Sequence, residues 1–384
     1  MCGFFGLIDF NQNISENDVN EIKQGAKVAN YRGPDDKNDY HDNSFAVSFN
    51  RLSILDINAP SQPLISEDKN LVLVCNGEIY NYKELRNQLS KKYNFKTNLD
   101  TEVLIPGYLE WGDELWKKLN GMFSIVIWNK KNKRLSMIRD HVGIKPLHYF
   151  LCKNRIYFSS DYSSFFEQKF KKMQFNKDSM LSYISFRYVI GKNTFFKDIF
   201  DVLPGEKIEI NSNHIKKEIY WDVSLGSKID KGESNYVENL NLQIESAIER
   251  QLVSDVPVGA FVSGGIDSSL ILSHMSKNLS NINVFATGFD EENYNELEYV
   301  DLIAKELSLN VDKTIVDENV FVNEIQNVLK FRGEPNAIPH ETAFYLMSKK
   351  MNNKIKVVLS GEGADELFGG YGRLFKSPLD FYKK

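Results

Sequence analysis

Two glycine-rich stretches carry the residue types that bind phosphate, and each follows an apolar run. The first, S-G-G-I-D-S-S, covers residues 263–269, and the second, S-G-E-G-A-D-E, covers residues 360–366. Glycines let the main chain approach a ligand closely, and the N–H groups that open a helix attract an anion. Ligands bind at the carboxyl ends of strands in a parallel sheet. The two loops are therefore expected to face one ATP.

The carboxylates in these loops indicate a cation beside the phosphates. The Walker loop requires a lysine after its glycines, and neither loop has one. Instead, Asp267 lies inside the first loop, and Glu362 and Asp365 lie inside the second. A carboxylate repels phosphate unless a cation lies between them, so we expect Asp267 and Asp365 to hold Mg²⁺. Glu362 is a candidate acid or base near the reacting group. The alternative is a glycine turn in which Asp267 only caps a helix.

A third stretch, M-C-G-F-F-G-L-I-D-F, opens the chain. It is not typical of a secretory signal, because no basic region precedes it and the apolar run stops at Asp9. One interpretation is an N-terminal strand with its apolar residues on a core. The other is that Met1 is removed and Cys2 becomes the first residue of the working protein.

Composition limits the class of protein. The 384 residues are 42% hydrophobic and 26% charged, which is typical of globular proteins, and the length favours two domains. The net charge of −5 disfavours nucleic acid as a partner, and no apolar run approaches the ~20 residues of a membrane helix. The cysteines Cys2, Cys75 and Cys152 are odd in number, which favours a reducing compartment. Without a targeting segment, we expect the cytoplasm.

Hydrophobic periodicity divides the chain in two. The first half contains alternating or apolar runs, such as 71–82 and 121–140, that predict strands. The second half alternates strands with helices, which predicts a parallel sheet with helices on both faces. A polar, turn-rich stretch separates the halves, so we predict a first domain over 1–215, a linker over 216–235 and a second domain over 236–384.

The two loops resemble the synthetase domain of glutamine-dependent asparagine synthetases, a family of pyrophosphate-loop ATP enzymes. The resemblance implies that ATP is cleaved to AMP and pyrophosphate while the adenylyl group passes to a carboxylate. Family members continue past the position of Lys384, so the second domain is expected to be incomplete. The ATP-binding residues that the resemblance implies are Phe261, Val262, Ser263, Gly264, Gly265, Asp267, Ser268, Ser269, Thr287, Gly288, Ser360 and Gly361.

The first half resembles the class II glutamine amidotransferase domain of the same family, an N-terminal-nucleophile hydrolase with a four-layer αββα sandwich. This α+β fold would precede the α/β parallel-sheet domain. Members begin with Cys-Gly after methionine removal, as this chain would. Cys2 would then attack the side-chain amide of glutamine, with its own α-amine (reference pKa ~7.7–8.0) as base.

The resemblance assigns the other glutaminase residues one by one. R-L-S-I-L-D resembles the glutamine-binding stretch, in which Arg51 would pair with the substrate carboxylate. Asn76 and Gly77 would stabilise the oxyanion as catalytic residues beside Cys2. Asp140 and Lys145, in R-D-H-V-G-I-K, are interpreted as an internal structural pair. The implied glutamine-binding residues are Arg51, Leu52, Ser53, Ile54, Leu55, Asn76, Gly77, Glu78 and Asp100.

These assignments lead to one expected function and two alternatives. The expected function is that of a glutamine-dependent amidotransferase, which passes ammonia to an acyl-adenylate. Aspartate is the default acceptor, and asparagine is the product. The family usually reads D-E-P-F where this chain has G-E-P-N, and His340 and Glu341 follow in the area expected to shape the acceptor pocket. The same chemistry on another carboxylate, such as a sugar acid, is therefore one alternative. A degenerate nucleotide-binding regulator is the other. The sequence leaves the oligomeric state open, a homodimer included.

Overall fold

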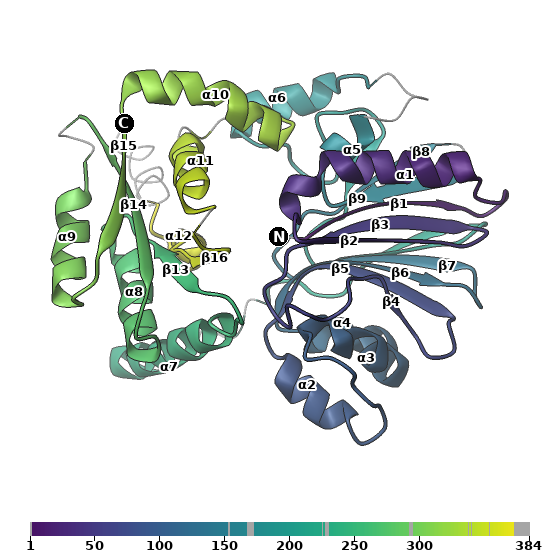
Figure 1. Cartoon of the computed structure of the whole chain (residues 1–384), viewed down its shortest axis with the longest axis horizontal. Helices are drawn as coiled ribbons and strands as arrows, with labels where there is room; N and C mark the ends of the chain where they lie inside the picture. The colour runs from purple at the N-terminus through teal and green to yellow at the C-terminus, as the bar shows by residue number, and fades with distance from the viewer. Residues whose placement is uncertain are drawn as a thin grey trace. The chain divides into compact units, whose positions relative to one another are not determined.

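The chain forms two compact units, residues 1–229 and 230–384, in a computed structural model (Figure 1). The structure describes residues 2–152, 154–166, 173–224, 226, 230–291, 295–336, 338, 340–352 and 354–371. Each unit has its own apolar core.

The first unit contains two six-stranded sheets in which every neighbouring pair is antiparallel. One sheet has the order β10-β8-β9-β1-β3-β2, and the other has the order β12-β11-β7-β6-β5-β4. The strands are β1 Gly3–Asp9, β2 Asp36–His41, β3 Phe45–Arg51, β4 Leu64–Ile65, β5 Leu71–Ile79, β6 Gly121–Asn129, β7 Arg134–Arg139, β8 His148–Cys152, β9 Arg155–Ser159, β10 Ile199–Asp201, β11 Glu206–Ile210 and β12 Ile215–Ile219.

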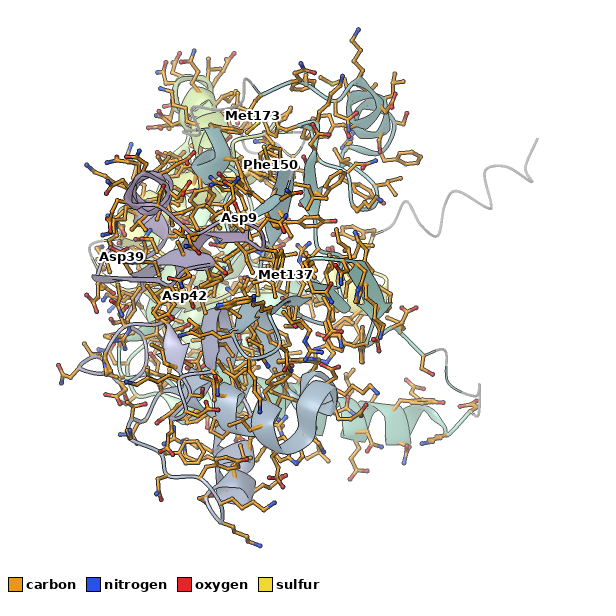
Figure 2. The ribbon with its side chains drawn as sticks, turned by 90° about the vertical axis from the view of Figure 1, so that its right-hand side faces the viewer. Asp9, Asp39, Asp42, Met137, Phe150 and Met173 are labelled. Carbon is orange, nitrogen blue, oxygen red and sulfur yellow. The ribbon has the colours of Figure 1, made fainter. Side chains whose placement is uncertain are left out.

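The two sheets pack face to face, with helices outside them. The core between the sheets takes Phe4 and Phe45 from one sheet and Val74 and Met137 from the other. A second cluster joins Phe150 of the first sheet, labelled in Figure 2, to Ile22 and Ala26 of α1 on the outer face of that sheet. The unit is thus the expected αββα sandwich (Figure 1). Its helices are α1 Glu16–Val28, α2 Tyr82–Leu89, α3 Leu104–Trp111, α4 Leu115–Lys118, α5 Ser163–Phe166 and α6 Lys177–Phe186, with 3₁₀ turns η1 Asn30–Arg32, η2 Asp100–Val103 and η3 Gly112–Glu114.

The second unit contains a four-stranded parallel sheet of order β15-β14-β13-β16. Apolar clusters lie on both of its faces, one including Leu272 of α8 and the other Met347 of α11. The predicted parallel sheet with helices on both faces is confirmed. Its elements are α7 Glu233–Gln251, β13 Val258–Phe261, α8 Ile266–Asn278, β14 Asn283–Phe289, α9 Leu297–Glu306, β15 Val311–Val316, α10 Glu318–Arg332, α11 His340–Met351, β16 Val357–Leu359 and α12 Ala364–Phe368.

The stretch 216–235, predicted as a linker, carries regular structure at both ends. Strand β12 covers Ile215–Ile219 and pairs with β11, while α7 begins at Glu233. The exposed, charged residues of β12 gave no apolar signal, because β12 is the edge strand of its sheet. In the described part of the chain, no helix is long and apolar enough to cross a membrane.

Candidate active sites

Cys2 lies at one end of the core between the two sheets. It directly precedes β1, whose Phe4 and Ile8 face that core, and its own side chain packs against it. The N–H of Leu52 donates to Cys2 Sγ at 3.4 Å, and Arg32 Nε donates to the Cys2 carbonyl at 3.3 Å. Cys2 is therefore held through both its thiol and its main-chain carbonyl at the edge of an apolar interior.

Strand β5 contributes polar side chains to the same core between the sheets. Val72 and Val74 face the inter-sheet core, and because side chains alternate along a strand, Asn76 and Glu78 continue that row. Asn76 is 0% exposed, and neither atom of its side-chain amide has a hydrogen-bond partner among the described residues. A buried amide without partners is costly, so this one is available to a ligand.

Gly77 allows the close approach of β6. It lies opposite Phe123, and a Cβ atom added at Gly77 would come 2.1 Å from the carbonyl oxygen of Met122. Any larger residue would push the two strands apart. The glycine thus holds the main chain of β5 in place between Asn76 and Glu78.

Two carboxylates lie together at the end of this row, with Asp100 buried and Glu78 half-buried. Asp100 opens η2, and its Oδ2 accepts a hydrogen bond from the N–H of Ile79 at 2.7 Å. Burial raises the pKa of Asp100 to about 7, and the neighbouring charge of Glu78 adds to the effect. Burial also raises the pKa of Glu78. A ligand ammonium between the two would relieve this cost, so the pair can bind a cationic group.

Arg51 organises the loop that follows β3. It is buried, and its guanidinium donates to the carbonyls of Leu55 at 3.1 Å, Asp56 at 2.8 Å and Ala59. The predicted glutamine-binding residues 52–55 therefore lie in a loop wrapped around Arg51. Its pairing with a substrate carboxylate remains a prediction, whereas its bonds to the main chain give it a structural role that the sequence did not indicate.

The interpretation of Asp140 and Lys145 as an internal pair is wrong for the two side chains. The Asp140 carboxylate accepts from the main-chain N–H groups of Phe123, Ile144 and Lys145 at 3.2, 2.9 and 2.9 Å. Within the described residues, no carboxylate comes within ion-pair distance of the Lys145 ammonium. Asp140 thus orders a loop, and the Lys145 ammonium lies in the electrostatic field of Cys2 and Glu78.

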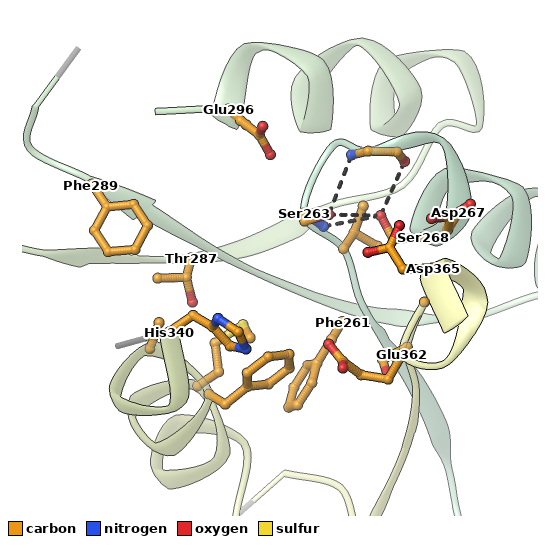
Figure 3. Close-up of a pocket in the computed structure, with 17 residues that line it drawn as sticks. Phe261, Ser263, Asp267, Ser268, Thr287, Phe289, Glu296, His340, Glu362 and Asp365 are labelled. Carbon is orange, nitrogen blue, oxygen red and sulfur yellow. Dashed lines mark hydrogen bonds between the residues drawn. The ribbon is translucent and has the colours of Figure 1, made fainter. Parts of the chain in front are cut away.

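The second unit has a pocket of about 280 Å³ at the carboxyl ends of its strands (Figure 3). Most of the predicted ATP-binding residues line it, together with Glu362 and Asp365. Gly264, Ser269 and Gly288 do not. An added Cβ would come 2.9 Å from the Glu296 carbonyl at Gly264 and 2.3 Å from the Leu297 side chain at Gly288. These two glycines let the sheet pack against the start of α9. The lining residues are Phe261, Val262, Ser263, Gly265, Asp267, Ser268, Thr287, Phe289, Glu296, His340, Ala343, Phe344, Met347, Ser360, Gly361, Glu362 and Asp365.

The first loop leaves a helix end open toward this pocket. Helix α8 begins after the N-cap residue Gly265, which provides no side-chain cap, and Asp267 lies in the first turn. The alternative in which Asp267 caps the helix is therefore wrong. Ser263 and Ser268 hold the loop itself, since Ser268 Oγ accepts from the Ser263 N–H at 3.2 Å and donates to the Gly265 carbonyl at 3.2 Å (Figure 3). The uncapped N–H groups are free to bind an anion.

The charges of the pocket suit a magnesium-bound nucleotide. The carboxylates of Asp267, Glu296, Glu362 and Asp365 line it, and no lysine or arginine does so among the described residues. Within the described ranges, no group of three metal-ligating side chains comes together. Mg²⁺ commonly takes one or two carboxylates and completes its shell with phosphate oxygens and water, so Asp267 and Asp365 fit this ion.

Two further pocket residues refine the sequence prediction. Thr287 Oγ1 is buried without a hydrogen-bond partner among the described residues, so its hydroxyl is available to a ligand. His340 lines the pocket, but Glu341 does not. Glu341 instead pairs with Arg332, which also binds Glu334 at 2.8 Å. Only the first of the two residues expected to shape an acceptor pocket therefore lines this cavity.

Comparisons with known proteins match a family model to each of the two units. The family model for a glutamine amidotransferase domain matches residues 1–221, and that for asparagine synthase matches residues 239–382. Asparagine synthetase [glutamine-hydrolyzing] 1 of Bacillus subtilis is 35% identical over 99% of this chain, which spans 60% of the length of that relative. Putative asparagine synthetase [glutamine-hydrolyzing] 2 of Methanocaldococcus jannaschii is 30% identical over 100% of this chain and 78% of its own length. Among solved structures, glutamine phosphoribosylpyrophosphate amidotransferase from Bacillus subtilis covers 97% of this chain and 93% of its own at 12% identity, with a TM-score of 0.41.

The buried Asp100 carboxylate predicts a gain in stability when its charge is removed. Its pKa of about 7 in the folded protein exceeds the ordinary value of 3.8, so the protonated form is favoured by folding. This contribution is fully present below pH 4 and is lost as the pH rises through 7. Asp100→Asn should therefore raise the free energy of unfolding at pH 8 by on the order of 4 kcal/mol, and by less at pH 5.

Thermal unfolding of the ligand-free chain at the two pH values measures this difference. Asp68→Asn is the control, because hydrogen bonds from Ser66 and Asn70 lower the pKa of that exposed carboxyl to about 2. It should give no gain at pH 8. If Asp100→Asn changed the stability by the same amount at both pH values, the raised pKa of Asp100 would be contradicted.

The position of Asp267 predicts its role in nucleotide binding. Asp267→Asn should weaken ATP binding about tenfold or more in the presence of Mg²⁺, because one carboxylate beside the bound cation is lost. Without Mg²⁺ the variant should bind ATP no worse than the parent chain. Calorimetry measures both affinities, with Asp301→Asn, an exposed residue of α9 paired with Lys313, as control. Equal weakening with and without the cation would exclude Asp267 as a metal ligand.

Proposed function

The chain belongs to the glutamine-hydrolysing asparagine synthetase family, and we propose that its two units perform the two halves of an amidotransferase reaction. The first unit hydrolyses glutamine to glutamate and ammonia. The second activates a carboxylate with ATP, releasing pyrophosphate, and ammonia then displaces AMP to form an amide. The observation that carries the proposal is the fully buried amide of Asn76, which has no hydrogen-bond partner among the described residues, together with Cys2 and the Glu78–Asp100 pair.

In the first unit, each group has a distinct task. Glu78 and Asp100 hold the ammonium of glutamine, which places its side-chain amide toward Cys2. With Met1 removed, the Cys2 α-amine takes the thiol proton, and Sγ attacks the amide carbon. The Asn76 amide and the Gly77 N–H then donate to the oxyanion, a contribution typically worth about 10²–10³ in rate. The α-ammonium returns its proton to the departing nitrogen, so ammonia leaves and a thioester forms. Water then cleaves the thioester to give glutamate and the free thiol.

In the second unit, the open end of α8 receives the phosphates of ATP. The hydroxyls of Ser263 and Ser268 lie in the same loop, and Glu362 lines the pocket beside them. Mg²⁺, held by Asp267 and Asp365, would neutralise the charge that builds on the departing pyrophosphate. Glu362 is placed as an acid or base near the carboxylate to be activated.

Aspartate is the default acceptor, and another carboxylate is the second candidate. The observation that favours the second is that His340 is the one basic side chain among the described residues that line the pocket, while Arg332 is bound by Glu334 and Glu341. An α-carboxylate such as that of aspartate would therefore find little positive charge there in the described part of the chain.

Loss of the nucleophile tests the proposed division of labour. Cys2→Ala should lower glutamate release from glutamine by on the order of 10³-fold or more, because no other group forms the thioester. ATP binding should stay within twofold of the parent value, since the nucleotide pocket lies within the other unit. Cys152→Ala, which changes a half-buried cysteine of β8, is the control and should release glutamate normally. Substantial glutamate release by Cys2→Ala would refute the proposed nucleophile.

The acceptor can be identified by measuring pyrophosphate release from ATP. Aspartate is tried first, followed by a panel of amino acids and sugar acids that carry a free carboxylate. We expect release to depend on one of them and to fall strongly in Glu362→Gln. If His340 contacts the acceptor, His340→Ala should raise the KM for that acceptor more than the KM for ATP. A chain that binds ATP and hydrolyses glutamine, but activates none of the panel, would contradict the synthetase half of the proposal.

A further inference from the structure

The loop between β7 and β8 fixes the main chain of Lys145 from both sides. The guanidinium of Arg139 donates to the carbonyl of Lys145 at 2.9 Å and to those of Gly143 and Val202 at 2.8 Å. The carboxylate of Asp140 accepts from the N–H of Lys145 at 2.9 Å. Gly143 adopts a φ of +75°, which a residue with a side chain rarely does. This loop is rigid at the point where Lys145 leaves it.

The side chain of Lys145 is buried without an ion-pair partner. It is 4% exposed, and within the described residues no carboxylate comes within 4.0 Å of its ammonium. Lys207, the other deeply buried lysine among the described residues of the first unit, is 2% exposed and has Asp113, Glu209 and Glu218 at 2.5, 3.7 and 3.8 Å. A lysine is almost never buried unless it is paired, so the contrast requires an explanation.

The groups that act electrostatically on Lys145 belong to the candidate glutaminase site. Burial lowers the pKa of Lys145; Glu78, Cys2 and Asp140 oppose this, and Arg32 adds to it. In return, Lys145 lowers the pKa of Cys2 and of Glu78 against the effect of their own burial. The geometry agrees, because the Asp140 carboxylate joins the N–H of Lys145 to that of Phe123, and Phe123 pairs with Gly77 between Asn76 and Glu78.

We propose that Lys145 is a positioning residue of the glutaminase site, whose buried ammonium balances the negative charge of the Cys2 thiolate and of ionised Glu78. This inference rests on the proposed function of the first unit. Before substrate binds, the ammonium favours ionised Glu78, which can then accept the substrate ammonium. When the thiol proton leaves for the α-amine, the same positive charge stabilises the thiolate until sulfur bonds to carbon.

A structural role alone would give a different pattern of variants. If Lys145 only filled space, Lys145→Met would conserve its function, because the two side chains have similar length and the loss of a buried charge would stabilise the fold. If its charge matters, Lys145→Arg should retain the function and Lys145→Met should lose it. Lys207→Met is the matched control, since it also removes a buried ammonium from the first unit.

Alkylation of Cys2 by iodoacetamide measures the thiolate directly and does not require glutaminase activity. Sulfur displaces iodide, so the rate follows the ionised fraction, and mass spectrometry of the N-terminal peptide separates Cys2 from Cys75 and Cys152. In Lys145→Met, the midpoint of the rate against pH should rise and the rate at pH 7 should fall, because the thiolate loses a stabilising charge. Lys145→Arg and Lys207→Met should keep the parent midpoint. A folded Lys145→Met with the parent midpoint would overturn the proposal.

A second measurement uses the parent sequence, before and after alkylation, and is independent of how any variant folds. Coupling between two groups is reciprocal, so removing the thiolate must affect Lys145. Titration of the Lys145 ammonium by NMR should give a lower pKa after Cys2 is alkylated than before, because the thiolate no longer stabilises the cation. An unchanged lysine titration would overturn the proposal. If the chain proves unable to hydrolyse glutamine, the proposed function fails, while these two measurements still decide the role of Lys145.

Discussion

Burial of charge at one end of an apolar core is the constraint on which the first unit depends. The sandwich needs inward rows of apolar side chains from both sheets, and Phe4 and Val74 supply them. The same rows end in Cys2, Asn76 and Glu78, so the site inherits the low polarity of the core. In such surroundings an unpaired charge costs several kcal/mol, and each interaction with a ligand is strengthened to the same degree. The fold and the chemistry are thus set by one packing arrangement.

In the ligand-free site, burying charged and polar groups costs free energy, and a bound substrate can reduce that cost. The charge of Glu78 raises the cost of ionising Asp100. Among the described residues, the Asn76 amide lacks hydrogen-bond partners and the Lys145 ammonium has no ion pair. A zwitterionic amino acid with a side-chain carbonyl offers an ammonium to the carboxylates and an oxygen to the amide. The polar groups that lack partners in the described structure therefore match the polar groups of such a ligand. Rigid main-chain features, such as the bonds of Arg139 and the close contact at Gly77, prevent these groups from collapsing onto one another.

The sequence predicted residues that act through their own chemistry better than residues that act through their neighbours. The loop containing Asp267 was recognisable because its spacing repeats a local motif, and Asp267 does line the predicted pocket. Gly264 and Gly288 were assigned to ATP, but their lack of a side chain serves the packing of α9, a contact set by residues far along the chain. Lys145 was interpreted as structural because its motif is dominated by loop-forming residues. Only the folded chain shows that the Asp140 carboxylate binds main-chain N–H groups and does not pair with the Lys145 ammonium. Strand β12 was missed because an exposed edge strand has no apolar alternation.

The two sites solve opposite electrostatic problems, and this explains why their residues differ in type. In the proposed function, the first would ionise a thiol and hold an ammonium at the end of a core, and it contains ionisable groups whose pKa values burial and neighbouring charges shift. The second would receive a highly charged nucleotide, and it offers main-chain N–H groups at the start of α8 and hydroxyls that bond to one another. Its carboxylates bring no favourable field for phosphate by themselves and become useful only when a cation joins them. Nucleotide binding in the second unit is therefore expected to be coupled to the cation, whereas ligand binding in the first is coupled to protons.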